Sequence, residues 1–152
     1  MMICGNIPVL KIGKILVPHD GSKNADRAFE YALDMAKKYN SKVLVASCIT
    51  VQDQLPEYAI SEEQAILKRQ KDAATRLVGI LELRAADAEV PFKGMILKTS
   101  SVSDAILSYA ESKDIDMIVM GSRGLGGFKK LFLGSVAGTV SQYSKCPVLI
   151  VK

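Results

Sequence analysis

A glycine-rich segment over residues 121–135 has the residue types and spacing that suit a phosphate-binding loop. Gly121 and Gly124 are expected to permit positive φ and a close approach of the backbone to a ligand. If a helix begins near Gly134, its free N–H groups and its dipole favour phosphate oxygens. The hydroxyl of Ser135, at the start of that helix, can donate a further hydrogen bond. The segment is therefore predicted to bind phosphate groups, largely through its backbone.

Three basic side chains in the same segment, Arg123, Lys129 and Lys130, add positive charge close to these glycines. We interpret the two lysines as solvated charges and Arg123 as a candidate for the site itself. No Asp, Glu or His occurs between Gly121 and Val136 to orient a water molecule or to hold Mg²⁺. Since phosphoryl transfer needs positioning as well as charge neutralisation, the loop is predicted to hold phosphates and to support at most slow hydrolysis.

Two better-known phosphate loops do not match this chain. A P-loop requires the pattern GxxxxGK[ST], and neither Gly-Lys-Ser nor Gly-Lys-Thr occurs in the sequence. A dinucleotide-binding fingerprint, GxGxxG, should follow the first strand, but residues 18–22 there read Pro-His-Asp-Gly-Ser. The later Gly-Leu-Gly run at residues 124–126 has Lys129 at the position of the third glycine. The spacing that is present is G-x2-G-x9-G-[ST], met by Gly121, Gly124, Gly134 and Ser135.

The elements that must position this segment alternate along the chain. Five short apolar runs without polar alternation are typical of buried parallel strands. They occupy residues 14–18, 43–49, 92–97, 116–120 and 147–151. The segments between them have helical periodicity, which predicts an α/β fold: one domain over residues 1–152, with an open, doubly wound five-stranded parallel sheet and helices on both faces. Ligands of such sheets bind at the carboxyl ends of the strands, so the residues after the first, second and fourth strands are candidates.

Four helices are predicted from capping residues and apolar periodicity. Ser22 is expected to cap the first helix. The pairs Ser61–Gln64 and Ser101–Asp104 are expected to begin the second and third, and the fourth begins at the end of the glycine-rich segment. The residues expected on the buried faces are, in chain order, Ala25, Ala28, Phe29, Ala32, Ala36, Ile66, Ala73, Leu77, Leu81, Val102, Ala105, Ile106, Tyr109, Val136, Val140 and Tyr143.

Composition excludes several classes of protein. The formal net charge is a modest +4 and the Lys and Arg residues are dispersed along the chain, so nucleic acid is not a predicted partner. The apolar runs are too short to span a membrane. Cys4, Cys48 and Cys146 form no disulfide framework or zinc motif, and we interpret them as reduced thiols of a cytoplasmic protein. Residues 1–8 lack the positive charge of a signal peptide and are interpreted as a lead-in to the first strand.

The loop spacing, together with three longer runs, resembles the universal stress protein family in its ATP-binding branch. The first run, residues 15–22, reads Ile-Leu-Val-Pro-His-Asp-Gly-Ser at the end of the first strand. The second, residues 116–124, joins the fourth strand to the glycine-rich segment, and the third, residues 146–151, is the terminal Cys-Pro-Val-Leu-Ile-Val. The resemblance covers nearly the whole chain and implies a Rossmann-like fold of the adenine nucleotide alpha hydrolase type.

The resemblance also implies an adenine-nucleotide site, with ATP as its ligand and any Mg²⁺ held mainly by the phosphates. It implies that Asp20 hydrogen-bonds the nucleoside and that Pro18 and Met120 wall the adenine. Backbone groups at Cys48 would read the adenine edge. The glycines after the fourth strand would face the ribose and phosphates, and the start of the last helix would hold the phosphate tail. The complete predicted nucleotide-binding set is Pro18, His19, Asp20, Cys48, Met120, Gly121, Arg123, Gly124, Gly134, Ser135 and Val136.

His19, Cys48 and residues 99–101 depart from the residues common in that family. A small or β-branched residue is common at the first position, Val at the second and a glycine in the third segment, before the third helix. As the only histidine of the chain, His19 could act as a catalytic base, but no nucleophile or second titrating partner accompanies it in the sequence. We favour a structural or pocket-lining role for His19 and predict no catalytic residues.

The last strand ends one residue before the end of the sequence, so its edge is expected to be open for pairing. The apolar side chains of Val148 and Ile150 favour an antiparallel contact between two identical strands. The family resemblance implies a homodimer of that kind.

Together these features predict a homodimeric ATP-binding regulator of a stress response, which signals nucleotide occupancy to an unidentified protein partner. One alternative is a dimeric stress scaffold that does not bind nucleotide, a branch that the family contains; the intact glycine spacing disfavours it. Another is a nucleotide-hydrolysing or nucleotidyl-transferring enzyme of similar fold, disfavoured because no catalytic carboxylate or histidine motif accompanies the loop. The long second helix and the connector over residues 52–58 are predicted places for a nucleotide-dependent change of shape.

Overall fold

Five parallel strands form one open sheet in the order β3-β2-β1-β4-β5. The computed structural model describes residues 10–52, 54, 56–126 and 132–152. The strands are β1 (Lys14–Pro18), β2 (Lys42–Thr50), β3 (Phe92–Thr99), β4 (Met117–Gly121) and β5 (Val148–Val151). This arrangement confirms the predicted doubly wound α/β fold, and it puts the reversal of strand order between β1 and β4.

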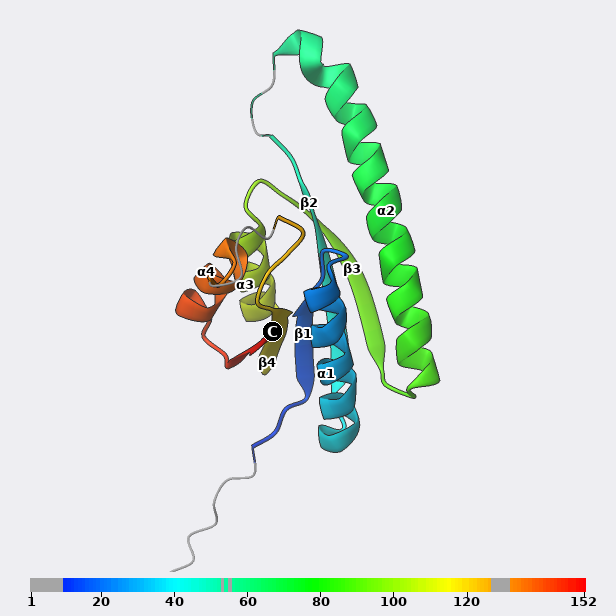
Figure 1. The fold of residues 1–152 in the computed structure, drawn as a ribbon, viewed down its shortest axis with the longest axis vertical. Coiled ribbons are helices and arrows are strands. Elements are labelled where there is room, and N and C mark those ends of the chain that lie inside the picture. The colour runs from blue at the N-terminus through cyan, green and yellow to red at the C-terminus, as the bar shows by residue number, and fades with distance from the viewer. Residues whose placement is uncertain (1–9, 53, 55, 127–131) are drawn as a thin grey trace, which may run out of the picture.

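Helices cover both faces of the sheet (Figure 1). Their bounds are α1 (Lys23–Tyr39), α2 (Ile60–Asp87), α3 (Val102–Ser112) and α4 (Ser135–Tyr143), and a short 3₁₀ turn, η1 (Glu57–Ala59), precedes α2. α1 and α2 lie on one face, whereas α3 and α4 lie on the other. The chain therefore changes face after β3, and its next strand, β4, pairs on the opposite side of β1.

Side-chain alternation along the strands divides the apolar residues between two cores. In β1, Ile15 and Val17 pack with residues of α1 and α2, while Leu16 packs with residues of α3 and α4. Each layer also contains a bulky helix residue with no exposed surface, Phe29 in α1 and Ile106 in α3. Both faces of the central strands are thus covered, which explains why these strands read as uninterrupted apolar runs.

β1 and β4 pair only near their amino ends. Ile15 aligns with Met117 and Leu16 with Ile118, whereas β1 aligns with β2 along all five of its residues. β1 and β4 therefore separate toward their carboxyl ends, and the connections that follow them lead to helices on opposite faces. An opening at this point of a doubly wound sheet is the expected location of a ligand.

The predicted helix starts are confirmed at α1 and wrong at α2. Ser22 is the N-cap of α1, and its hydroxyl accepts a hydrogen bond from Ala25 N at 3.2 Å. α2 begins at Ile60, one residue before Ser61, because the turn η1 continues directly into the helix without a capping side chain. The predicted Ser61 capping pair therefore lies inside the helix. Ser101 is the N-cap of α3 as predicted, but its side chain makes no capping hydrogen bond.

The predicted buried face of α1 is confirmed in full, whereas that of α2 is partly wrong. Ile66 and Ala73 are exposed, and α2 buries Ala74, Leu81 and Ala85 instead. With 28 residues, the helix is about 42 Å long. Figure 1 shows that its first half extends beyond the sheet. Apolar residues at helical spacing in that half are not buried, because the sheet does not extend beneath it.

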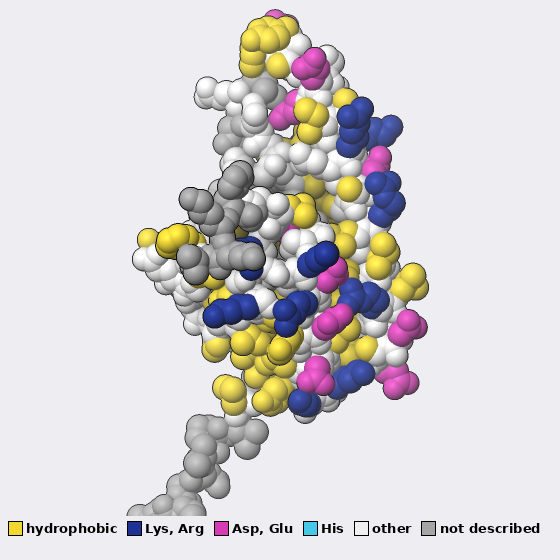
Figure 2. Space-filling model, in the orientation of Figure 1, with side chains coloured by type: hydrophobic (Ala, Val, Ile, Leu, Met, Phe, Trp, Pro, Cys, Tyr) yellow, Lys and Arg dark blue, Asp and Glu magenta, His cyan; other side chains and the backbone are white. Residues whose placement is uncertain are grey.

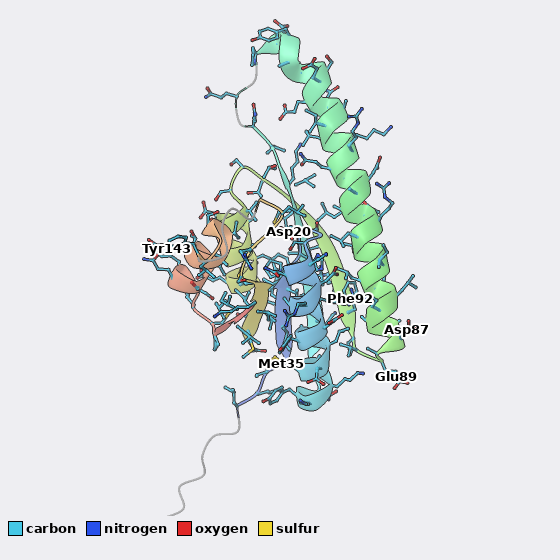
Figure 3. The ribbon with its side chains drawn as sticks, viewed as in Figure 1. Asp20, Met35, Asp87, Glu89, Phe92 and Tyr143 are labelled. Carbon is cyan, nitrogen blue, oxygen red and sulfur yellow. The ribbon has the colours of Figure 1, made fainter. Side chains whose placement is uncertain are left out.

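Asp116 and Tyr143 also depart from the sequence prediction. Asp116 directly precedes β4, and its carboxylate accepts hydrogen bonds from Gly13 N and Lys14 N, both at 2.8 Å, which join the beginnings of β1 and β4. Tyr143, expected to face inward, is 65% exposed at the end of α4. Figure 3 labels it on the side of the molecule opposite α2.

The charged surface in the view of Figure 2 is mixed, with Lys and Arg interspersed among Asp and Glu over the side of α1 and α2. In the part of the chain that the structure describes, no helix is both long and apolar enough to cross a membrane. Cys4, Lys129 and Lys130 lie outside the described residues, as do two positions of the connector over residues 52–58.

Leu81 and Leu83 provide a matched pair for testing how α2 docks on the sheet. Leu81 has no exposed surface, while Leu83 is 68% exposed on the same helix. Leu81→Ala is expected to lower the free energy of unfolding by about 2–5 kcal/mol, because it leaves a cavity in a closed core. Leu83→Ala should change it by about 0.5 kcal/mol or less. Urea denaturation at one fixed protein concentration measures both, and equal losses would contradict this packing.

Candidate functional site

A cavity of about 720 Å³ opens at the carboxyl ends of the strands, where β1 and β4 separate. Its volume is that of a small-molecule site. The structure brings all of the sequence-predicted site residues to the wall of this cavity: Pro18, His19, Asp20, Cys48, Met120, Gly121, Arg123, Gly124, Gly134, Ser135 and Val136. They come from three parts of the chain: the end of β1 with the turn after it, the end of β2, and the end of β4 with the loop and the start of α4 that follow. Their contacts with a ligand stay a prediction.

The end of β2 presents free backbone groups to the cavity. His19 N donates to Ala46 O at 2.9 Å, just past the end of β1. Alternate residues of a strand turn their N–H and C=O groups to the same side, so those of Cys48 also face this side, where β1 has already ended. Cys48 therefore offers one donor and one acceptor to the cavity. Burial raises the pKa of the Cys48 thiol to about 11, which makes the side chain a neutral wall rather than a nucleophile.

The N-terminus of α4 has no capping side chain. Gly134 is its N-cap, Gly134 N is bound to Ser122 O at 2.7 Å, and Gly138 N makes the first helical bond, to Gly134 O at 2.8 Å. The N–H groups of the three residues after Gly134 therefore have no acceptor within the helix. These three residues, which line the cavity, are Ser135, Val136 and Ala137. The positive end of the α4 dipole thus opens into the cavity with unused donors.

Gly121 and Gly124 are required by close packing, and the expectation of positive φ at these positions is wrong. Among the described glycines, the one with positive φ is Gly21, at +86°. A Cβ on Gly121 would lie 2.8 Å from the backbone of Asn24 in α1, and a Cβ on Gly124 would overlap Oδ2 of Asp20. Both glycines allow the loop after β4 to lie against the start of α1. The two glycines therefore permit a close approach between two segments of the protein itself, residues 121–124 and residues 20–24.

Asp20 joins the connection after β1 to the connection after β4. Its Oδ1 accepts a hydrogen bond from Ser22 N at 3.0 Å, and its Oδ2 accepts one from Leu125 N at 2.9 Å. Figure 3 shows Asp20 at the end of the sheet where α1 begins. The residue is exposed, and each carboxylate oxygen has a second lone pair. The same side chain can therefore hold the turn before α1 and accept a hydrogen bond from a ligand.

Charge at the cavity wall is sparse among the described residues. Asp20 and the half-buried Arg123 are the charged side chains there, since His19 is neutral. Lys129 and Lys130 follow Arg123 in the sequence but are not among the described residues. Across the described ranges, no group of three or more His, Cys, Asp or Glu is arranged to hold a metal ion.

His19 does not present its ring to the cavity as an exposed base. Its side chain has no exposed surface, and its Nδ1 accepts a hydrogen bond from Gly21 N at 3.1 Å. Burial lowers the pKa of His19 below its ordinary value, although the carboxylates of Asp26 and Asp20 oppose this shift. The neutral ring lies beside the turn that carries Asp20, in agreement with the structural role predicted for it.

Sequence reasoning missed several residues of the cavity wall, among them Thr50, Ile106, Leu125, Phe132 and Leu133. The alternation of β2 could have identified Thr50, because it lies two residues after Cys48 and points to the same side. The apolar rim at Leu125, Phe132 and Leu133 has no such signal. Its position depends on the path of the loop, which the residue types in the loop do not specify.

Comparisons with known proteins agree with this fold. The family model of the universal stress proteins matches residues 11–152. The chain belongs to the universal stress protein family. Among its relatives, universal stress protein YxiE of Bacillus subtilis is 33% identical in an alignment of 153 positions, which covers 91% of this chain and 98% of that protein.

Solved structures of universal stress proteins share the same architecture. Universal stress protein UspA from Lactobacillus plantarum superposes with a TM-score of 0.86 at 20% identity, over 93% of this chain and 99% of that one. A universal stress protein solved in complex with cAMP superposes with a TM-score of 0.72 at 25% identity, over 93% of this chain and 98% of that one. The family predicted from the sequence is confirmed, and its fold accounts for nearly the whole chain.

Gly124→Ala and Gly126→Ala test whether the loop glycine serves the Asp20 contact. A Cβ at Gly124 would displace Asp20 Oδ2 from Leu125 N, whereas a Cβ at Gly126 meets no atom within 4 Å. We expect Gly124→Ala to lower the free energy of unfolding by about 0.5–1.5 kcal/mol, the contribution of one hydrogen bond. It should also accelerate amide exchange at Leu125, while Gly126→Ala leaves both nearly unchanged. Equal exchange rates in the two variants, measured by NMR, would refute the assignment.

Proposed function

We propose that this universal stress protein binds an adenine nucleotide, with ATP as its ligand, and acts as a nucleotide-responsive regulatory protein. The observation that carries the proposal is the uncapped N-terminus of α4, whose first three N–H groups line a cavity at the strand-order reversal. Helix N-termini of this kind bind phosphate through their N–H groups and their dipole. Arg123 adds a guanidinium beside them, suited to a phosphate oxygen.

The other end of the cavity has the chemistry of an adenine site. The Watson–Crick edge of adenine carries an acceptor and a donor side by side, which complements the donor and acceptor of the Cys48 backbone. Pro18 and Met120 supply apolar surface for the two faces of the base. Asp20 lines the same cavity, where its carboxylate would accept hydrogen bonds from the nucleoside. The solved structure with cAMP, a relative of 25% identity, supports an adenine nucleotide as the class of ligand.

The regulatory part of the proposal rests on the role assigned to Asp20. Among the described residues, Asp20 is the acidic side chain of the wall, and its bonds to Ser22 N and Leu125 N hold its carboxylate in the turn, where we assign it to the nucleoside. Any Mg²⁺ would be held mainly by the phosphates. Fast phosphoryl transfer requires a group that positions the nucleophile, so we expect at most slow hydrolysis and a signal that depends on occupancy.

A homodimer through β5 completes the proposal. β5 is an edge strand, and Ile118 N and Ser122 N of the β4 side bind Pro147 O and Val151 O. Because strand polar groups alternate in direction, those of Val148 and Ile150 face away from β4. They would pair with the same groups of a second copy about a two-fold axis.

Gly134→Asp tests the nucleotide proposal. Asp is a favoured N-cap residue, so its carboxylate should cap α4 while it occupies the phosphate position and repels a phosphate. The matched control is Gly79→Asp, which adds the same charge to α2 at a position with no atom within 4 Å of a Cβ. Mass spectrometry of ligand released from freshly purified protein should find adenine nucleotide in wild type and in Gly79→Asp, and little in Gly134→Asp. Equal content in all three would remove the phosphate argument, and none in wild type would favour a scaffold without nucleotide.

Ile150→Pro tests the dimer. Proline removes the outward N–H of Ile150 while leaving the pairing with β4 intact, as edge strands allow. Two hydrogen bonds are lost by symmetry, so the dimer dissociation constant should rise about tenfold or more. Ile150→Ala, which keeps the N–H, is the control for the lost side chain. Sedimentation equilibrium measures all three proteins, and a wild type that stays monomeric at every concentration would overturn the dimer.

A further inference from the structure

His19 is the only histidine of the chain, and its ring lies beside the cavity where β1, α1 and α2 meet. The side chain has no exposed surface, and the ring packs edge-on against Phe29 of α1 with the centroids 6.5 Å apart. None of the contacts proposed for the nucleotide uses this ring. Its neighbours in sequence, however, form the turn that carries Asp20.

Hydrogen bonding defines which nitrogen of the ring is protonated. Nδ1 of His19 accepts the proton of Gly21 N at 3.1 Å. A ring nitrogen accepts a hydrogen bond only when it carries no proton, so the ring proton is assigned to Nε2. Gly21 has a φ of +86°, a conformation that glycine adopts readily. The bond from Nδ1 therefore holds the glycine whose positive φ shapes the turn.

Two neighbouring side chains of this turn each accept a hydrogen bond from the backbone two residues further on. His19 Nδ1 holds Gly21 N, and Asp20 Oδ1 holds Ser22 N at 3.0 Å. Asp20 Oδ2 reaches across to Leu125 N at 2.9 Å. The first bond thus sets the turn from which Asp20 reaches both the cavity and the loop after β4. Loss of that bond would displace the acidic residue of the cavity wall.

Charged groups surround the ring on three sides. From α1, Asp26 Oδ1 lies 3.3 Å from Nε2 of His19, although the two atoms are not aligned for a hydrogen bond. From α2, Arg84 donates to the same Oδ1 at 3.1 Å and to Glu30 at 3.3 Å. Asp20 is the charged group of the turn itself. Burial lowers the pKa of His19, the carboxylates of Asp26 and Asp20 raise it, and the Arg84 guanidinium lowers it further.

Protonation of the ring would change what Nδ1 does and would make the ring positive. An imidazolium carries a proton on Nδ1, which then faces the N–H of Gly21 and cannot accept from it. Nε2 carries its proton in both states, but the positive ring attracts Oδ1 of Asp26 more strongly and repels the Arg84 guanidinium bound to that oxygen. Acid therefore removes the bond that holds the turn and weakens the contact between α1 and α2. Because the pKa of His19 is lowered in the fold, the ring is neutral at neutral pH and becomes charged only below its ordinary titration range.

We propose that neutral His19 is a positioning residue for the nucleotide cavity, and that protonation of its imidazole displaces the Asp20 turn and weakens nucleotide binding. This inference rests on the proposed nucleotide function and adds acid sensitivity to that site. The sign follows from linkage: if nucleotide binds the neutral form more tightly, affinity falls as pH decreases through the pKa of His19.

The test compares ATP affinity of wild type, His19→Phe and His19→Asn by calorimetry from about pH 7.5 down through the titration midpoint of the His19 ring, which NMR of wild type measures. Phenylalanine keeps the aromatic packing but lacks the acceptor, whereas asparagine can place an amide oxygen near the position of Nδ1 and does not titrate. We expect His19→Phe to bind ATP about tenfold more weakly than wild type at the upper pH, and His19→Asn to recover part of that loss. The ratio of the wild-type to the His19→Asn dissociation constant should rise about threefold or more in acid. Titration of the ATP phosphates cancels in this ratio.

A ratio that stays constant with pH, or a His19→Asn variant no tighter than His19→Phe, would overturn the inference. Absence of ATP binding by wild type at the upper pH would overturn the proposed function and this inference with it. Because the chain has one histidine, NMR of wild type provides a second readout that needs no variant to fold. The amide shift of Gly21 should follow the titration midpoint of the ring, and a Gly21 amide indifferent to that titration would refute the link.

Arg84→Gln extends the NMR test to α2. Removing the guanidinium that faces the ring should raise the titration midpoint of His19, since Arg84 lowers the pKa of this residue. The matched control is Lys38→Gln, which removes an exposed ion pair with Asp34 on the same helix as Asp26 and should leave the midpoint unchanged. Equal midpoints in both variants and wild type would contradict the assigned network.

Discussion

The short pairing between β1 and β4 is the constraint on which the rest of the site depends. Both strands are described along their full length, and they align at two positions, Ile15 with Met117 and Leu16 with Ile118. Beyond these positions the strands lead to α1 and α4, which lie on opposite faces of the sheet. The chain therefore cannot close the sheet at this end with ladder hydrogen bonds. A cavity of about 720 Å³ opens there, and backbone groups that would otherwise be paired face into it.

An opening of this kind must be spanned by other contacts if its walls are to keep their positions. Asp20 does this, because its two oxygens bind the turn before α1 and the loop after β4. Gly121 and Gly124 belong to the same contact, since a side chain at either position would press the loop away from Asn24 or from Asp20. The glycine spacing thus has a structural cause within the protein. This cause does not compete with the proposed role in phosphate binding, because the loop can present its backbone to a ligand only if it stays in place.

The sequence predicts the sheet better than it predicts the contacts that shape the site. Strands covered on both faces contain continuous apolar runs, such as residues 15–17 of β1 and 117–120 of β4, so their location is visible in the sequence. The inward face of α2 is predicted less well: Ile66 lies on the half that extends past the sheet, and Ala73 lies about 100° around the helix from Ala74, which is buried. The sequence predicts those residues of the cavity wall that lie at the end of a strand or directly after it. The contact between Arg84 and Asp26 is not predicted, because it joins residues 58 positions apart, and neither residue type indicates its partner.

The two ends of the cavity are both built from main-chain groups, at Cys48 in β2 and at the start of α4. A main-chain donor or acceptor does not change with the side chain attached to it, so a thiol at position 48 leaves the polar groups there intact. The side chains that matter most are then those that aim the main chain. Asp20 holds the loop after β4, and His19, which is buried beside it, holds the glycine that lets the Asp20 turn form. In the proposed nucleotide site, the residue types that matter are therefore those that position the backbone beneath the cavity surface, more than those at the surface itself.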